Sequence, residues 1–241
     1  MPVNCRITTT DPASQATLSV SVDRSQGGAS MVDGSVELMV HRRLQMDDRR
    51  GVGEPINEPG LDASGKGLII RGVHRVSLDA AAAAPANGKA AVQALTFRAQ
   101  AAFSPLPPGT NPATWLRTIR ASYSGLGEPL PANVHLLTVH SQGPHELLLR
   151  LAHLFETGED ANLSKPATVG LTNLFANTTL NGCVEHTTPG ARPVASVAQH
   201  TVSIEGEGAV TWPSLPAAPN GNSQAITISA MEIRTWRCYA S

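Results

Sequence analysis

The stretch Ser35-Val36-Glu37-Leu38-Met39-Val40 runs directly into His41-Arg42-Arg43-Leu44-Gln45-Met46-Asp47-Asp48-Arg49-Arg50-Gly51. In the first part Val36, Leu38 and Val40 occupy every second position, which predicts a β-strand with one face toward a core. The second part gathers arginines and aspartates in a chain of which only 15% of the residues are charged. Because Gly51 predicts a turn, this stretch predicts a β fold that carries a loop suited to holding a polar ligand.

The same alternation recurs along the chain and predicts an all-β fold. Strands are predicted around residues 18–22, 36–40, 68–78, 134–139, 147–155, 169–171, 202–204 and 226–228. Residues typical of turns separate them, and many short strands with frequent turns are typical of an antiparallel β-sandwich. The Gly- and Pro-rich segment 125–131 predicts a boundary between a larger sandwich portion, residues 1–128, and a smaller sandwich, residues 129–241.

One segment departs from this pattern and predicts a short helix. Apolar residues recur at helical spacing over Ala90–Phe103, and Pro105 would end the helix. The alanines of Ala80–Ala84 are expected to form an exposed linker, or else to extend the helix. Pro85 and Gly88 count against that extension.

Composition excludes two classes of partner. The 241 residues include 18 basic and 19 acidic side chains, so the chain has no net field to attract nucleic acid or an anionic membrane surface. No apolar stretch approaches the ~18 residues that a membrane-spanning helix needs. Met1–Thr10 has neither the basic start nor the apolar run of a signal peptide.

The three cysteines and the histidines do not predict a metal site. Cys5, Cys183 and Cys238 are far apart, without a C-x-x-C pair. They leave two arrangements open, namely one disulfide from Cys183 to Cys238 with Cys5 left over, or three separate thiols. His140 and His145 flank a Gly-Pro turn in a strand-like segment, whereas paired zinc histidines are typical of a helix.

The charged loop has two interpretations. Asp47 and Asp48 are neighbours that would point to opposite sides of an extended chain, so they are a poor pair for acid–base catalysis. One of them is expected to hold an arginine, because a carboxylate can fix a guanidinium plane for gripping sugar hydroxyls. The alternative is a solvated group of surface ion pairs, which contribute little. The sequence shows neither a G-x-S-x-G nucleophile motif nor a dinucleotide-binding fingerprint.

Several segments together resemble the C-terminal region of class II α-mannosidases, the enzymes of glycoside hydrolase family 38, and the lysosomal or vacuolar branch in particular. The specific block consists of Asp23-Arg24-Ser25-Gln26-Gly27-Gly28, Asp33–Leu44 and Asp47-Asp48-Arg49-Arg50-Gly51-Val52-Gly53-Glu54-Pro55. Weaker similarity continues at 133–138, 148–153, 158–160, 163–166 and 231–235. The similarity therefore spans nearly the whole chain.

The resemblance implies an enzyme that hydrolyses terminal α-linked mannose of N-glycans with retention of configuration. It implies that the nucleophile and the zinc ligands lie in an N-terminal α/β barrel outside this chain, against which the β-sandwiches pack. Arg50 would then bind the substrate, and Asp48 would orient Arg50. Arg49 departs from the family, which more often shows glycine or asparagine there. This chain alone is expected to be inactive.

The resemblance also implies further features of the whole protein. The sandwich at 1–128 would be a portion of a galactose mutarotase-like super-sandwich, and the compartment would be the lysosome, the vacuole or the exterior. The sequons at Asn162 and Asn177 agree with a secretory route. The alternative function is a standalone, non-catalytic carbohydrate-binding or scaffolding β-sandwich.

Overall fold

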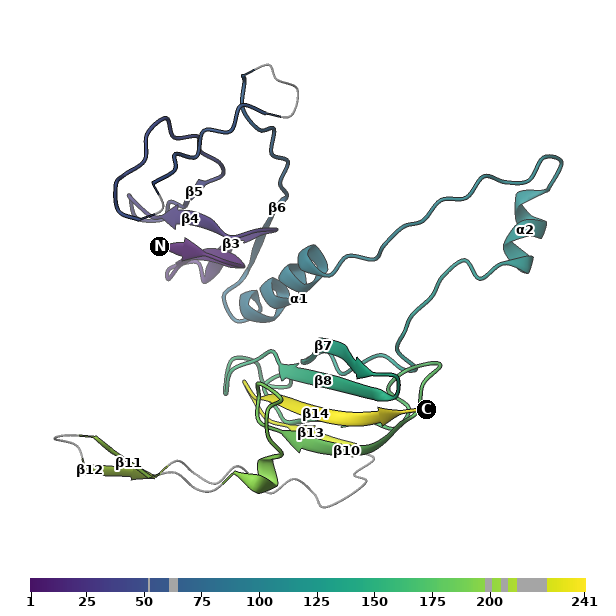
Figure 1. Ribbon diagram of the computed structural model, residues 1–241. Helices are drawn as coiled ribbons and strands as arrows, with labels where there is room; N and C mark the ends of the chain where they lie inside the picture. The colour runs from purple at the N-terminus through teal and green to yellow at the C-terminus, as the bar shows by residue number, and fades with distance from the viewer. Residues whose placement is uncertain (52, 61–64, 198–200, 205–207, 212–224) are drawn as a thin grey trace. The chain divides into compact units, whose positions relative to one another are not determined.

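The computed structural model describes residues 1–51, 53–60, 65–197, 201–204, 208–211 and 225–241. It divides the chain into two compact units, Met1–Ala102 and Phe103–Ser241. All the strand pairs of the described residues are antiparallel (Figure 1), which confirms the predicted all-β fold class. The boundary at residues 128/129 stays a prediction.

The first unit contains two small sheets. One has the order β1-β4-β5 and consists of β1 (Pro2–Val3), β4 (Gln26–Ala29) and β5 (Glu37–Met39). The other has the order β2-β3-β6 and consists of β2 (Arg6–Asp11), β3 (Ala16–Val22) and β6 (His74–Ala80). A tight turn joins β2 to β3, and the carboxylate of Asp11 accepts hydrogen bonds from the backbone N–H groups of Ala13 and Ser14 in that turn. The strand expected at residues 36–40 forms as the short strand β5, at the edge of the β1-β4-β5 sheet.

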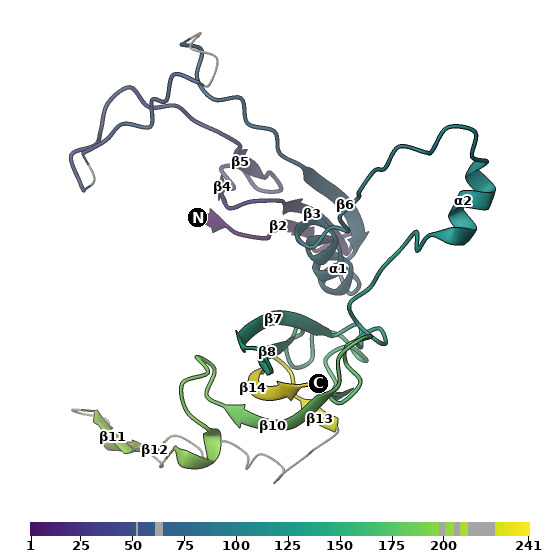
Figure 2. The same ribbon diagram turned by 45° about the vertical axis from the view of Figure 1, so that its right-hand side comes forward.

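Helix α1 (Ala84–Thr96) covers the polar face of the β2-β3-β6 sheet, where β3 carries Thr17, Ser19 and Ser21. These three side chains are buried. Figure 2 shows the helix beside β3 and β6. Arg6 donates from Nη1 to the carbonyl oxygen of Ala84 at 2.8 Å. Small side chains on the sheet let the alanine-rich helix approach closely, and a side chain at Gly88 would collide with the Arg6 guanidinium.

The opposite face of the same sheet carries mainly apolar side chains, which are half-buried on β2 and β3 and exposed on β6. Antiparallel pairing forms two cross-strand rows, Ile7-Val20-Val76 and Thr9-Leu18-Leu78. Val76 is 64% exposed and Leu78 is 73% exposed. Alternation on a strand was expected to bury the apolar side. Here the helix covers the serine and threonine side instead, so the sequence pattern gives the strand correctly but not the face that is covered within this chain.

The helices differ from the single one predicted at Ala90–Phe103. α1 begins earlier, because Pro85 fits the first turn of a helix, where its missing N–H costs nothing. The helix ends where the N–H of Phe97 donates to the Gln93 carbonyl oxygen. A second helix, α2 (Pro112–Thr118), follows Asn111, whose side chain caps it by accepting from the N–H of Ala113 at 2.8 Å.

The second unit is a small sandwich of two sheets. The larger sheet has the order β10-β14-β8-β7 and consists of β7 (Val134–Gly143), β8 (Glu146–His153), β10 (Leu180–His186) and β14 (Ile233–Ala240). The smaller sheet pairs β9 (Ala167–Gly170) with β13 (Ala225–Ile228). A short 3-10 turn (Val194–Ser196) and the hairpin β11 (Thr201–Ile204) to β12 (Gly208–Thr211) follow β10.

One hydrophobic core joins the two sheets of this sandwich. Leu149 and Leu151 of β8 and Trp236 of β14 pack with Val169 of β9 and Ile228 of β13. Burying a side chain of this size contributes roughly 1.5–3 kcal/mol, so these core side chains are a main source of stability of the unit.

Two further contacts cross-link the larger sheet of the sandwich. Cys183 of β10 and Cys238 of β14 form a disulfide, whereas Cys5 is free and exposed. Arg234 donates to both carboxylate oxygens of Glu185, at 2.7 and 2.5 Å. This ion pair raises the pKa of Arg234. Among the described residues, no helix has both the length and the apolar character to cross a membrane.

Candidate functional site

The charged residues singled out in the sequence lie in one long connection between β5 and β6, residues 40–73, called here the β5–β6 loop. The strand expected near residue 68 does not form, and Leu68–Ile70 belong to this loop. Long loops on a sheet scaffold are common positions for binding residues. The loop is therefore the first candidate for a ligand-binding site.

At the tip of the loop, two aspartates hold the main chain in consecutive turns. The N–H of Arg49 donates to Oδ2 of Asp47 at 2.8 Å, and the N–H of Arg50 donates to Oδ1 of Asp48 at 3.0 Å. Arg49 has a φ of 60°, a conformation that glycine and asparagine adopt more easily. Both arginines are exposed, so the Arg50 side chain is accessible to a ligand.

Arg43 links distant parts of the loop to one another. Its Nε donates to Oδ1 of Asn57 at 2.6 Å, and its Nη1 donates to the carbonyl oxygen of Gly65 at 3.0 Å. The adjacent N–H of Leu44 donates to the carbonyl oxygen of Ile56 at 2.8 Å. These contacts join the two sides of the loop on either side of the Asp47–Arg50 tip.

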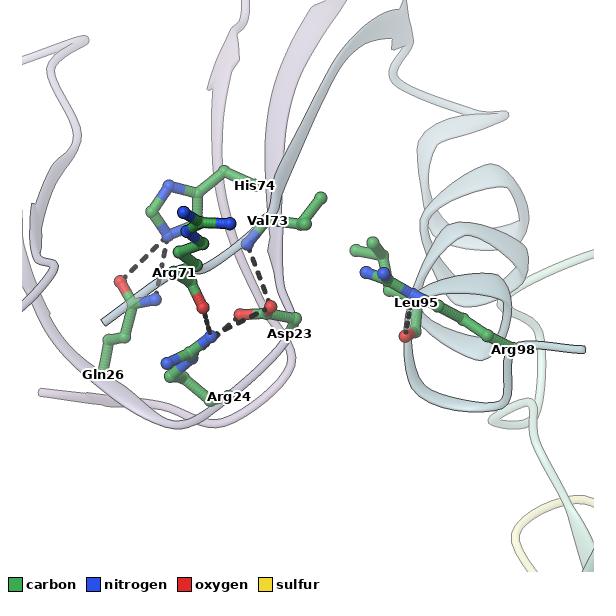
Figure 3. Close-up of polar contacts among 8 residues, drawn as sticks. All are labelled: Asp23, Arg24, Gln26, Arg71, Val73, His74, Leu95 and Arg98. Carbon is green, nitrogen blue, oxygen red and sulfur yellow. Dashed lines mark hydrogen bonds and ion pairs between the residues drawn. The ribbon is translucent and has the colours of Figure 1, made fainter. Parts of the chain in front are cut away.

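The base of the loop is fixed by a charged pair at the end of β3 (Figure 3). Asp23 accepts two hydrogen bonds from the guanidinium of Arg24, at 3.1 and 3.3 Å, and one from the N–H of Val73 at 2.9 Å. Arg24 also donates from Nη2 to the carbonyl oxygen of Arg71. The hydrogen bond from Arg24 holds the pKa of Asp23 below its usual value, and Asp23 raises the pKa of Arg24.

Next to this pair, Gln26 and His74 are joined by their side chains. Nε2 of His74 lies 2.9 Å from Nε2 and 3.1 Å from Oε1 of the Gln26 amide. Sequence reasoning named Asp23 and Gln26 only as part of the family resemblance and gave them no role. The adjacent opposite charges of Asp23 and Arg24, directly after the strand that ends at Val22, could have indicated their structural role.

The two sequon asparagines lie in exposed turns of the second unit. Asn162 follows Asp160, whose Oδ1 accepts from the N–H groups of Asn162 and Leu163 at 2.8 and 2.7 Å. Asn177 lies in the connection between β9 and β10. Both positions are accessible to a modifying enzyme.

One histidine of the second unit is buried. His153 lies within hydrogen-bonding distance of the Asn133 side chain, at 3.1 Å, and of the Lys165 carbonyl oxygen, at 3.0 Å. Throughout the part of the chain that the structure describes, no group of three or more His, Cys, Asp and Glu side chains could hold a metal ion. These residues therefore do not fit the zinc that the resemblance implies for the full enzyme, and we assign no zinc-dependent step to them.

The amino-acid sequence that forms this loop and the β-sheets is similar to the sequences of known proteins. The chain is similar along almost all of its length to α-mannosidases of the lysosomal type, which confirms the resemblance predicted from the sequence. It is 43% identical to the lysosomal α-mannosidase of Bos taurus in an alignment 244 residues long, which covers 98% of this chain and 22% of the relative.

Other relatives give the same result. The lysosomal α-mannosidase of Homo sapiens is 43% identical in an alignment 241 residues long that covers 98% of this chain. An α-mannosidase of Arabidopsis thaliana is 37% identical in an alignment 242 residues long that covers 97% of this chain. The chain spans about a fifth of the length of these relatives, 22% and 23% respectively. No family model matches the chain.

Proposed function

We propose that this chain is the C-terminal β-sandwich part of a glycoside hydrolase family 38 α-mannosidase that removes terminal α-linked mannose from N-glycans with retention of configuration. The observation that carries the proposal is the 43% identity to lysosomal α-mannosidase over 98% of the chain. The similarity covers both units, so it does not rest on one short motif.

Within that enzyme, Arg50 binds the substrate and Asp48 sets its position. The exposure of Arg50 at the tip of a cross-linked loop supports this role. A guanidinium presents several N–H donors in a fixed plane and suits the hydroxyl groups of a sugar. The nucleophile and the zinc ion belong to the remaining polypeptide, so the chain alone is inactive in this proposal.

The partner of this chain is the N-terminal catalytic α/β barrel of the same enzyme. The exposed apolar face of the β2-β3-β6 sheet supports a partner, because contiguous apolar surface of this kind marks interaction sites. The compartment is the lysosome or the vacuole, in agreement with the names of the mammalian relatives. Asn162 and Asn177 are glycosylated in that secretory route.

The test is a kinetic comparison in the full-length enzyme that contains this chain, with a chromogenic α-mannoside as substrate. Arg50→Ala should lower kcat/KM by about ten- to a hundredfold, since a lost charged hydrogen bond in a site costs ~1.5–3 kcal/mol. An unchanged kcat/KM would remove Arg50 from the site. The chain by itself should show no turnover above a blank and no retention of mannosides on a glycan array. Micromolar binding there would favour a standalone binding module instead.

A further inference from the structure

One short segment, residues 23–29, contacts both ends of the β5–β6 loop. At the exit of the loop, Asp23 accepts from the N–H of Val73 at 2.9 Å, and Arg24 donates to the carbonyl oxygen of Arg71. At the entry, β4 pairs with β5 in the register Gly27↔Met39 and Gly28↔Leu38. The separation of the two ends of the loop is therefore set by a segment that lies outside the loop.

The Asp23–Arg24 pair at the exit fixes the orientation of its two charged groups as well as the distance between them. Arg24 donates from Nε and Nη2 to the two carboxylate oxygens of Asp23, so the planar guanidinium and the carboxylate orient each other. One carboxylate oxygen and one guanidinium nitrogen then remain in contact with main-chain groups of the loop (Figure 3). The side chains are 17% and 38% exposed, so solvent screens the charges, and the contribution of the pair to global stability is small.

Inside the loop, Arg43 joins the two sides of the loop by its hydrogen bonds to Asn57 and Gly65. A displacement at the exit is thus passed to the tip that carries Asp48 and Arg50. Misplacement of a substrate-binding group by about 1 Å can cost a hundredfold in rate.

From these contacts we infer that Asp23 and Arg24 are positioning residues that hold the substrate-binding loop of the enzyme at its base. The inference rests on the proposed function, because it assumes that the loop carries the substrate-binding arginine. Neither residue touches substrate in this account. Asp23 acts through the main chain of Val73, and Arg24 acts through the main chain of Arg71.

The test uses Asp23→Ala in the full-length enzyme, with Asp11→Ala as the matched control. Asp11 is another aspartate of the first unit that accepts backbone hydrogen bonds, but it is exposed and caps the β2–β3 turn. Asp23→Ala should increase amide hydrogen exchange in peptides covering 42–58 and 71–73 and lower kcat/KM about ten- to a hundredfold. Asp11→Ala should change neither. Asp23→Asn keeps an acceptor for Val73 and should recover part of the loss.

A double-mutant cycle separates positioning from a general loss of structure. If Asp23 acts through the loop, Asp23→Ala should cause no further loss of kcat/KM in an Arg50→Ala background. An equal loss in both backgrounds, or unchanged exchange at 42–58, would overturn the inference. Arg50→Ala distinguishes the two claims: if it lowers kcat/KM and Asp23→Ala does not, only the positioning role fails. If Arg50→Ala leaves kcat/KM intact, the proposed function of the loop fails and the inference falls with it.

Discussion

The carboxylate of Asp48 accepts a hydrogen bond from the backbone N–H of Arg50 at 3.0 Å. If Asp48 acted on the guanidinium of Arg50, its negative charge would matter. The contact with the backbone N–H of Arg50 requires only an acceptor oxygen at the position of Asp48 Oδ1. The same arrangement joins Asp47 to the N–H of Arg49. The tip is thus two successive side-chain-capped turns.

The contact distinguishes two ways in which Asp48 can act on the proposed enzyme. Asp48→Asn keeps the acceptor oxygen, so kcat/KM toward an α-mannoside should stay within about threefold, whereas Asp48→Ala should lower it about tenfold, the cost of one lost hydrogen bond of ~1–1.5 kcal/mol. Steady-state kinetics of the two full-length variants give the answer. Equal losses for asparagine and alanine would show that the charge of Asp48, rather than its turn, is what matters. Arg49→Asn is the control, since asparagine tolerates the φ of 60° at that position.

Sequence patterns predicted the strands more reliably than the surfaces that cover them. Leu18 and Val20 predict β3 by their alternation, yet the covered face is that of Ser19 and Ser21, whose small side chains let the alanine-rich helix α1 approach closely. The strand β14 did not stand out, since Arg234 and Arg237 interrupt its apolar alternation. The structure accommodates both arginines by ion pairs, with Glu185 and Glu146 respectively.

For the loop, the sequence indicated the charged residues but not their partners. Asp47 and Asp48 bind main-chain N–H groups, a local contact that the spacing of two residues could have suggested. The contacts of Asp23 with Val73 and of Arg24 with Arg71 span 50 and 47 residues. Such pairs depend on how β3 and β6 meet, which only the folded chain shows.

The turn after β8 should make the free energy of unfolding depend on pH in the acid range. Backbone hydrogen bonds from Leu163 and Asn162 lower the pKa of Asp160, so the fold favours the carboxylate form. A lowered pKa contributes stability above the unfolded value of about 3.9, and this stability is lost as the pH falls through the lower folded value. Urea unfolding midpoints of the wild type should therefore exceed those of Asp160→Asn at pH 5 and 7, and the difference should shrink below about pH 4.

The control for this measurement is Glu156→Gln, which changes the same charge in the same loop. Its difference from the wild type should show a weaker dependence on pH over that window. A constant difference between wild type and Asp160→Asn from pH 7 to pH 3 would contradict the account.

The Cys183–Cys238 disulfide should be a major source of stability in the second unit. It closes a loop with a sequence separation of 55, and Cys238 is buried in the core. Constraint of the unfolded chain by a loop of this size corresponds to about 4 kcal/mol. Replacing both cysteines with alanine should lower the free energy of unfolding in urea by ~2–4 kcal/mol. Cys5→Ser, at an exposed free thiol, is the control and should change it by less than about 0.5 kcal/mol. Equal unfolding free energies for the double variant and the wild type would show that the bond is not stabilising.

The apolar face of the β2-β3-β6 sheet should behave differently in the chain alone and in the longer enzyme. Replacing Val76 and Leu78 with threonine places a β-branched side chain, which suits a strand, at both positions and removes apolar surface. In the chain alone, where these residues are 64% and 73% exposed, the change should reduce binding of a hydrophobic dye by half or more and alter the unfolding free energy by less than about 1 kcal/mol.

In the full-length enzyme the same double variant should be destabilising, because burial of each side chain against a partner is worth roughly 1.5–3 kcal/mol. Thermal unfolding of the enzyme, followed together with dye binding, measures this. Tyr239→Thr is the control, because Tyr239 lies on the second unit and is 65% exposed. This substitution also removes exposed apolar surface, but it leaves the β2-β3-β6 sheet unchanged. A double variant that is equally neutral in both proteins would mean that the rest of the enzyme leaves this face open. A loss found only in the longer protein would identify the face as the surface on which the remaining polypeptide packs.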